Sequence, residues 1–144
     1  MSPDFYLWGW VCAISLIAAL YDTNTQRIPD RLLSLGIIVL GAGLIWALQG
    51  PQIWTHLGSG IVGLWIGALF FYFKIMGGGD AKLLSLVSLM VPVDYLLELL
   101  LWIFIAGGIL ALWARFIFKQ KAIPYAVAIF GGVFAFGAVR LLIF

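Results

Sequence analysis

The chain has 144 residues, of which 65% are hydrophobic and only 10% are charged, whereas an ordinary soluble domain carries about a quarter charged residues. This balance argues against a soluble domain and predicts an integral membrane protein. The formal net charge of +2 is scattered between hydrophobic segments, which argues against nucleic-acid binding. Cys12 is the single cysteine, so the sequence offers neither an internal disulfide nor a paired-cysteine metal site.

Three apolar runs in the first half of the chain approach the length that a helix needs to cross a bilayer. They cover residues 5–21, 32–48 and 57–73. A polar stretch from Asp22 to Arg31 separates the first two, and a turn at Gly50 and Pro51 with a short loop carrying Trp54 and His56 precedes the third.

Small residues recur every four positions in the third run, at Ser59, Gly63 and Gly67. This spacing allows two helix backbones to approach each other closely in lipid. We therefore expect the third helix to pack in the centre of the bundle.

The second half of the chain contains one ambiguous segment and two clear ones. Residues 83–93 are apolar but short for a crossing, and Pro92 ends them. The alternative is a single crossing over residues 83–105 with a kink at Pro92; we favour the short helix. Residues 95–118 and 125–144 complete an all-α, polytopic membrane bundle of about six transmembrane helices, expected to form one domain over residues 1–144.

Basic residues predict the orientation of this bundle, because Lys and Arg concentrate in cytoplasmic loops. With the N-terminus outside, seven of the eight basic residues fall on the cytoplasmic side, and Arg140 is the exception. The seven are Arg27, Arg31, Lys74, Lys82, Arg115, Lys119 and Lys121. The same topology brings Asp22 and Asp80 to one membrane face, although they are almost sixty positions apart.

Two carboxylates at one depth have a definite chemical use. Neighbouring carboxyl groups share a proton, so the ionised one can take a proton from water while the protonated one polarises a peptide carbonyl. Asp80 follows a glycine run, Gly77 to Gly79, whose missing side chains allow a backbone to approach the carboxylate and allow the loop to move. Asp80 alone could be a plain helix cap, and Asp22 alone a solvated loop residue; only the pairing predicts aspartic proteolysis.

The segment Gly77-Gly78-Gly79-Asp80-Ala81-Lys82-Leu83 resembles the Gly-x-Gly-Asp-x-Lys-Leu motif of type IV prepilin peptidases. Asp22 followed by Arg27-Ile28-Pro29 resembles the first aspartate of that family with its downstream Ile-Pro, and Ile123-Pro124-Tyr125-Ala126 resembles the start of its last helix. The resemblance covers essentially the whole chain. It implies a GxGD membrane endopeptidase that cleaves the leader of pilin-like precursors at the cytoplasmic face, with Asp22 and Asp80 as catalytic residues and no cofactor or metal.

The compact form of the chain is most similar to the short Flp (tight adherence) pilin peptidases. Larger bifunctional members carry paired cysteines and an extra cytoplasmic region for N-methylation, whereas here Cys12 is alone. The implied partners are a prepilin precursor and the lipid bilayer of a prokaryotic cytoplasmic membrane; the sequence leaves the particular pilin and the oligomeric state open. An archaeal preflagellin peptidase, a presenilin-like intramembrane protease and a small ion or proton transporter remain as alternatives.

Supporting roles around the two aspartates are also open. Gly77 and Gly79 belong to the motif, and Lys82 either orients Asp80, meets lipid phosphate or anchors the topology. Helix dipoles favour Asp80, at a helix start, as the ionised partner, and Asp22, at a helix end, as the proton carrier. Three acidic residues serve as controls without an expected role, namely Asp30, Asp94 and Glu98.

Overall fold

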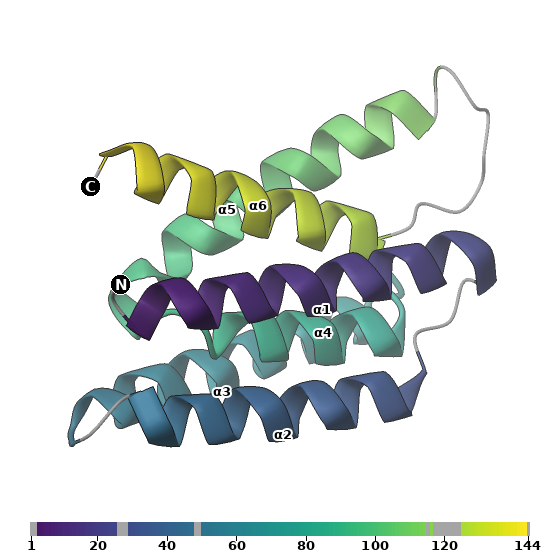
Figure 1. Ribbon diagram of the computed structural model, residues 1–144. Coiled ribbons are helices and arrows are strands. Elements are labelled where there is room, and N and C mark those ends of the chain that lie inside the picture. The colour runs from purple at the N-terminus through teal and green to yellow at the C-terminus, as the bar shows by residue number, and fades with distance from the viewer. Residues whose placement is uncertain (1–2, 26–28, 48–49, 115, 117–124, 144) are drawn as a thin grey trace.

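The computed structural model describes residues 3–25, 29–47, 50–114, 116 and 125–143, and within these ranges it is all-helical, without strands. Six helices follow one another along the chain (Figure 1). They are α1 (Pro3–Thr25), α2 (Asp30–Ala47), α3 (Gln52–Tyr72), α4 (Gly78–Ser88), α5 (Val93–Trp113) and α6 (Tyr125–Ile143). The all-α fold predicted from the sequence is confirmed.

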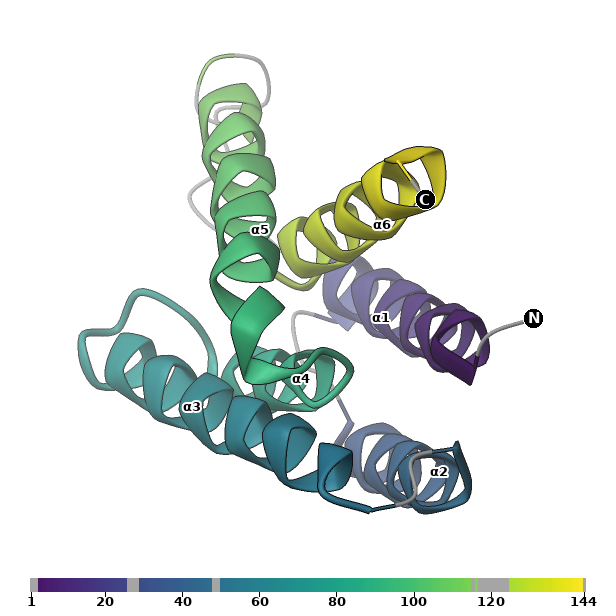
Figure 2. The same cartoon turned by 90° about the vertical axis from the view of Figure 1, so that its left-hand side faces the viewer.

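The short helix α4 lies in the middle of the molecule, with the other five helices arranged around it (Figure 2). Its apolar side chains are among the most deeply buried of the chain: Leu83, Leu84, Leu86 and Val87 are each at most 2% exposed. A helix that is covered on most sides needs apolar residues around most of its circumference, and α4 provides them, with Lys82 as its exposed position. The sequence predicted α3 in the centre, but α3 turns Trp65 outward and α4 takes that place.

Several helix ends differ from the predicted ones. Trp54 and His56 lie within α3, not in a loop, because the turn is completed at Gly50, which has a φ of 93°, and Pro51 can begin a helix. The preference for a short fourth helix is confirmed, since α4 ends at Ser88 and α5 begins after Pro92. The glycine run is not a free loop, because α4 already begins at Gly78.

Helices α3 and α4 pack closely at the small residues of α3, as the small-residue spacing predicted. A Cβ atom added to Gly67 would lie 2.8 Å from the carbonyl oxygen of Ala81. Ser85 Oγ donates a hydrogen bond of 2.9 Å to the carbonyl of Gly60. At the far end of α4, His56 Nδ1 lies 3.0 Å from the carbonyl of Leu89 and must be the donor, because a carbonyl only accepts. α3 therefore fixes the position of α4 along its whole length.

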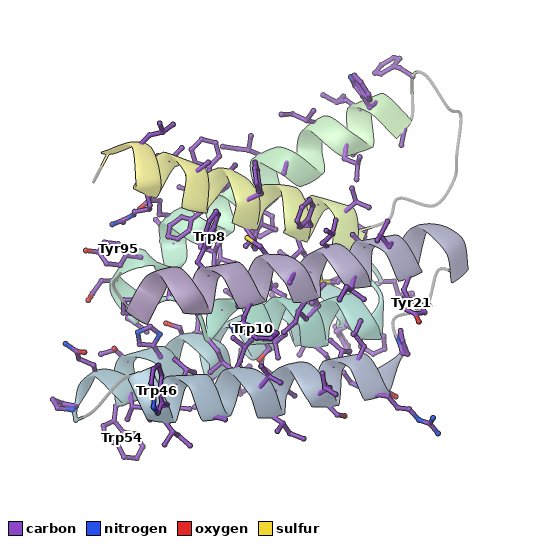
Figure 3. All side chains as sticks on the ribbon, in the orientation of Figure 1. Trp8, Trp10, Tyr21, Trp46, Trp54 and Tyr95 are labelled. Carbon is purple, nitrogen blue, oxygen red and sulfur yellow. The ribbon has the colours of Figure 1, made fainter. Side chains whose placement is uncertain are left out.

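The two chain termini lie at one end of the bundle, and the end of α1 and the start of α6 lie at the other (Figure 1). Figure 3 places Tyr21 at this second end and Trp46, Trp54 and Tyr95 at the first. Two helices, α3 and α5, are long and apolar enough to cross a membrane, and shorter apolar stretches cover Trp8–Asp22 and Tyr125–Arg140.

Candidate active site

Asp22 lies inside α1, three residues before its end, and is only 8% exposed. The predicted polar loop therefore begins later than expected. Its Oδ2 atom accepts a hydrogen bond of 3.4 Å from the backbone N–H of Ala126, near the start of α6. Two helices from opposite ends of the sequence thus meet at this carboxylate.

Asp80 lies in the first turn of α4 and is 9% exposed. Gly77 is the N-cap residue, with an extended backbone, and its N–H donates a hydrogen bond of 3.3 Å to Asp80 Oδ2. Asp80 is thus three residues past the cap and reaches back to it, as acidic residues at this position often do. A Cβ on residue 77 would lie 3.1 Å from this oxygen, so the glycine leaves room for the carboxylate.

The second oxygen of Asp80, Oδ1, is buried and has no hydrogen-bond partner, the only such side-chain atom among the described residues. A buried carboxylate oxygen without a partner is costly when it carries charge. Burial of Asp80 and, to a smaller extent, the nearby charge of Asp22 raise the pKa of the Asp80 carboxyl group to about 6, against a lowering effect of the Gly77 N–H. The two aspartates are therefore close enough to interact electrostatically.

Lys82 does not contact Asp80 but forms an ion pair with Asp30, with 2.7 Å between Nζ and Oδ1. The pair joins the fifth residue of α4 to the first turn of α2. Both side chains are largely exposed, at 56% and 78%, so the pair contributes no more than about 1 kcal/mol. Asp30, for which the sequence predicted no role, is thus the partner of Lys82.

The other two acidic controls lie at the far end of the bundle. Asp94 is exposed in the first turn of α5, and Glu98 forms an ion pair of 2.7 Å with Arg140 of α6. The Arg140 guanidinium also lies over the ring of Tyr95, 3.8 Å from its centre. Neither Asp94 nor Glu98 belongs to the end of the bundle that holds Asp22 and Asp80.

Sequence reasoning missed two parts of the site. The Ala126 N–H contacts Asp22 through the backbone, and the resemblance of Ile123-Pro124-Tyr125-Ala126 to the start of the family's last helix was the available signal. No feature of the sequence indicated which residue pairs with Lys82, because its partner Asp30 is 52 positions away. Seven residues singled out in the sequence lie outside the described residues, namely Arg27, Ile28, Arg115, Lys119, Lys121, Ile123 and Pro124.

The arrangement supplies two buried carboxyl groups and backbone donors, and the residues described offer no group of three His, Cys, Asp or Glu side chains that could hold a metal ion. Such a site is suited to proton transfer with a water molecule.

A protein-family model matches the chain. The family model described as the type IV leader peptidase family matches residues 10–112, a range that contains both Asp22 and Asp80. Neither the curated proteins nor the solved structures include a significant match. Because the family model covers more than half of the chain, including the whole of α2, α3 and α4, this protein belongs to the type IV leader peptidase family.

Proposed function

We propose that the protein is a membrane aspartic endopeptidase that removes the leader peptide of type IV prepilins of the Flp type, or of pilin-like precursors. One observation carries the proposal: two buried aspartates from α1 and α4, almost sixty positions apart, lie close enough at one end of the bundle for their charges to interact. Membership of the leader peptidase family supports a prepilin-type substrate.

In the proposed reaction, the ionised carboxylate of the pair takes a proton from a water molecule. The water oxygen forms a bond to the carbonyl carbon of the scissile peptide, and the protonated carboxyl group donates its proton to the carbonyl oxygen. When the tetrahedral intermediate collapses, the C–N bond breaks, and the leaving nitrogen takes up the proton that came from water. One hydroxyl group of the intermediate returns its proton to the other carboxylate, which forms the new carboxyl terminus and restores the singly protonated pair. The chain's own groups suffice for every proton transfer.

The proposal includes six membrane-associated helices, with the N-terminus outside and the aspartates at the cytoplasmic face of a prokaryotic cytoplasmic membrane. Of the described basic residues, three flank helix ends at the aspartate end of the bundle, namely Arg31, Lys74 and Lys82. Arg140 at the other end is paired with Glu98, which offsets its charge. Exposed aromatic side chains such as Trp10, Trp46 and Trp54 suit a lipid environment (Figure 3).

Helix α4 has 11 residues and is about 16 Å long, which is too short to cross about 30 Å of hydrocarbon alone. Because the other helices surround α4, it does not have to span the hydrocarbon layer by itself. In this arrangement Asp80, at its first turn, faces the membrane boundary, where a substrate segment just outside the membrane could reach the carboxylates.

The direct test is incubation of the purified protein, in detergent or liposomes, with a synthetic Flp-type prepilin, followed by mass spectrometry of the products. We expect a single cut between the leader and the hydrophobic helix, and none with the Asp80→Asn variant. A cut inside the hydrophobic helix would favour a presenilin-like protease. Ion flux in liposomes without any cleavage would favour a transporter.

A further inference from the structure

The first turn of α6 provides a buried donor to Asp22. The N–H of Ala126 donates to Asp22 Oδ2 across 104 positions of sequence, and Ala126 is 0% exposed. Amides in the first turn of a helix have no partner within the helix. Ala126 is the second residue of α6, so the N–H that reaches Asp22 is one that the helix itself does not use.

Packing along the rest of α6 holds this donor in place. Gly132 lies against the backbone of Ile103 in α5, and Trp8 Nε1 of α1 donates a bond of 3.4 Å to the carbonyl of Val133. Near its end, Arg140 is paired with Glu98 of α5. Because α6 is fixed to both neighbours, its amino end cannot move away from Asp22 without disturbing these contacts.

The two aspartates meet different electrostatic surroundings. Asp22 lies near the end of α1, where the helix dipole disfavours a negative charge, but the start of α6 brings the partial positive charge of its amino end. Asp80 also accepts one N–H, from Gly77, yet its Oδ1 is buried without a partner. A proton on Oδ1 would relieve the cost of a buried, unpaired and charged oxygen.

We propose, on the basis of the proposed function, that the amino end of α6 is a positioning element of the dyad: the Ala126 N–H orients Asp22 and keeps it ionised as the base, while Asp80 holds the proton. This reverses the assignment that helix dipoles within the sequence predicted. Burial raises the pKa of both carboxyl groups; at Asp80 the charge of Asp22 adds to the rise, whereas at Asp22 the Ala126 N–H opposes it. Of the described charged groups, Asp80 is the one that acts on this site, whereas Lys82 and Asp30 are exposed and paired with each other.

An amide-to-ester exchange tests this proposal with the smallest possible change. Lactate incorporated at position 126 by suppressor tRNA replaces the N–H with an oxygen and keeps the side chain. A hydrogen bond to a charged group is stronger than one between neutral groups, but this bond is long, so we expect kcat for prepilin cleavage to fall about tenfold at unchanged KM. Since ionised Asp22 loses its donor, the acid limb of the pH–rate profile should move to higher pH.

The matched control is the same exchange at Val127, whose N–H also lies in the first turn of α6, whereas the hydrogen bond to Asp22 comes from Ala126. Ala126→Pro and Val127→Pro form a second pair in which the N–H is removed genetically. Wild-type kcat and pH profile in the position 126 ester would overturn the proposal, and so would an equal loss in the position 127 ester.

A readout without substrate keeps this test separate from the proposed function. The infrared band of protonated Asp22, identified by its absence in Asp22→Asn, should persist to higher pH in the position 126 ester. If the unmodified protein cleaves no prepilin, the proposed function fails, yet this titration still decides whether the Ala126 N–H favours ionised Asp22. An unchanged titration overturns the inference even if the peptidase is active.

Discussion

Opposing effects act on the ionisation of Asp80. Its place in the first turn of α4 and the N–H of Gly77 favour the ionised form. Burial and the charge of Asp22 favour the neutral form, and they prevail, since the pKa rises to about 6. A dipole argument from sequence includes only the first effect, because burial depends on which helices surround the residue.

The raised pKa predicts how stability depends on pH. Between the ordinary value of 3.8 and about 6, folded Asp80 keeps a proton that the unfolded chain releases. The contribution of Asp80 to the free energy of unfolding is therefore greatest at low pH and declines as the pH rises through this window. Thermal unfolding in detergent at a series of pH values should show this decline in the wild type and a smaller one in Asp80→Asn. Identical pH dependence in the two proteins would contradict the raised pKa.

Gly77 allows a second test at single-residue scale. Its backbone is extended, with a φ of −72°, so an alanine is tolerated by the backbone itself. The added Cβ would lie 3.1 Å from Asp80 Oδ2 and push the carboxylate aside by a few tenths of an ångström. Because catalysis is sensitive to such displacements, we expect Gly77→Ala to lower kcat severalfold, up to about 100-fold, in the prepilin assay. Gly108→Ala, where a Cβ meets nothing within 4 Å, is the control and should leave kcat unchanged.

Both aspartates could be selected from sequence because each interrupts an apolar stretch and because the topology brings them to one face. The ion pair between Lys82 and Asp30 could not be predicted from the sequence, since it depends on α2 lying beside α4. The contact of Asp22 with Ala126 is made by the backbone, which carries no residue-specific signal.

Among the helix contacts, the packing of α3 against α4 determines the position of the site. Gly67 faces the backbone of Ala81, the residue after Asp80, so this contact sets the depth at which Asp80 is held. The four-residue spacing of small residues predicted a close helix contact but not its partner. Helix ends were harder to predict, because Trp54 and His56 have polar groups that fit either a loop or a helix start.

Gly67→Ala tests this contact. Its Cβ would lie 2.8 Å from the Ala81 carbonyl oxygen, a backbone atom that cannot rotate away. Overpacking of this kind costs about 1–3 kcal/mol, so the free energy of unfolding and the prepilin cleavage rate should both fall. Gly41→Ala in α2, where a Cβ meets nothing within 4 Å, should instead be neutral or stabilising by up to about 1 kcal/mol. If Gly67→Ala were as stable and active as Gly41→Ala, α3 would not position α4.

The described charges divide between the two ends of the whole molecule. Asp22, Asp80 and the pair of Lys82 with Asp30 lie at one end, and the pair of Arg140 with Glu98 lies at the other. Helix order along the chain was enough to predict this division. Composition predicted the apolar exterior, but the central position of α4 required knowledge of all the neighbours at once.

The proposed orientation predicts which positions react with a membrane-impermeant thiol reagent in intact cells. In a Cys12→Ser background, Gly50→Cys, in the turn between α2 and α3, should be labelled from outside. Lys74→Cys, at the aspartate end, should be labelled only after the membrane is permeabilised. The reverse pattern would place the aspartates outside.

The central claim is that Asp22 and Asp80 act together as one catalytic pair, and processing of a co-expressed Flp-type prepilin tests it most directly. Precursor and mature pilin are separated by electrophoresis, and the amount of each variant in the membrane is measured alongside. We predict that Asp22→Asn and Asp80→Asn each abolish processing at normal membrane levels, while Asp94→Asn, at the opposite end of the bundle, processes like the wild type. Retained processing in either single variant of the pair would contradict the account.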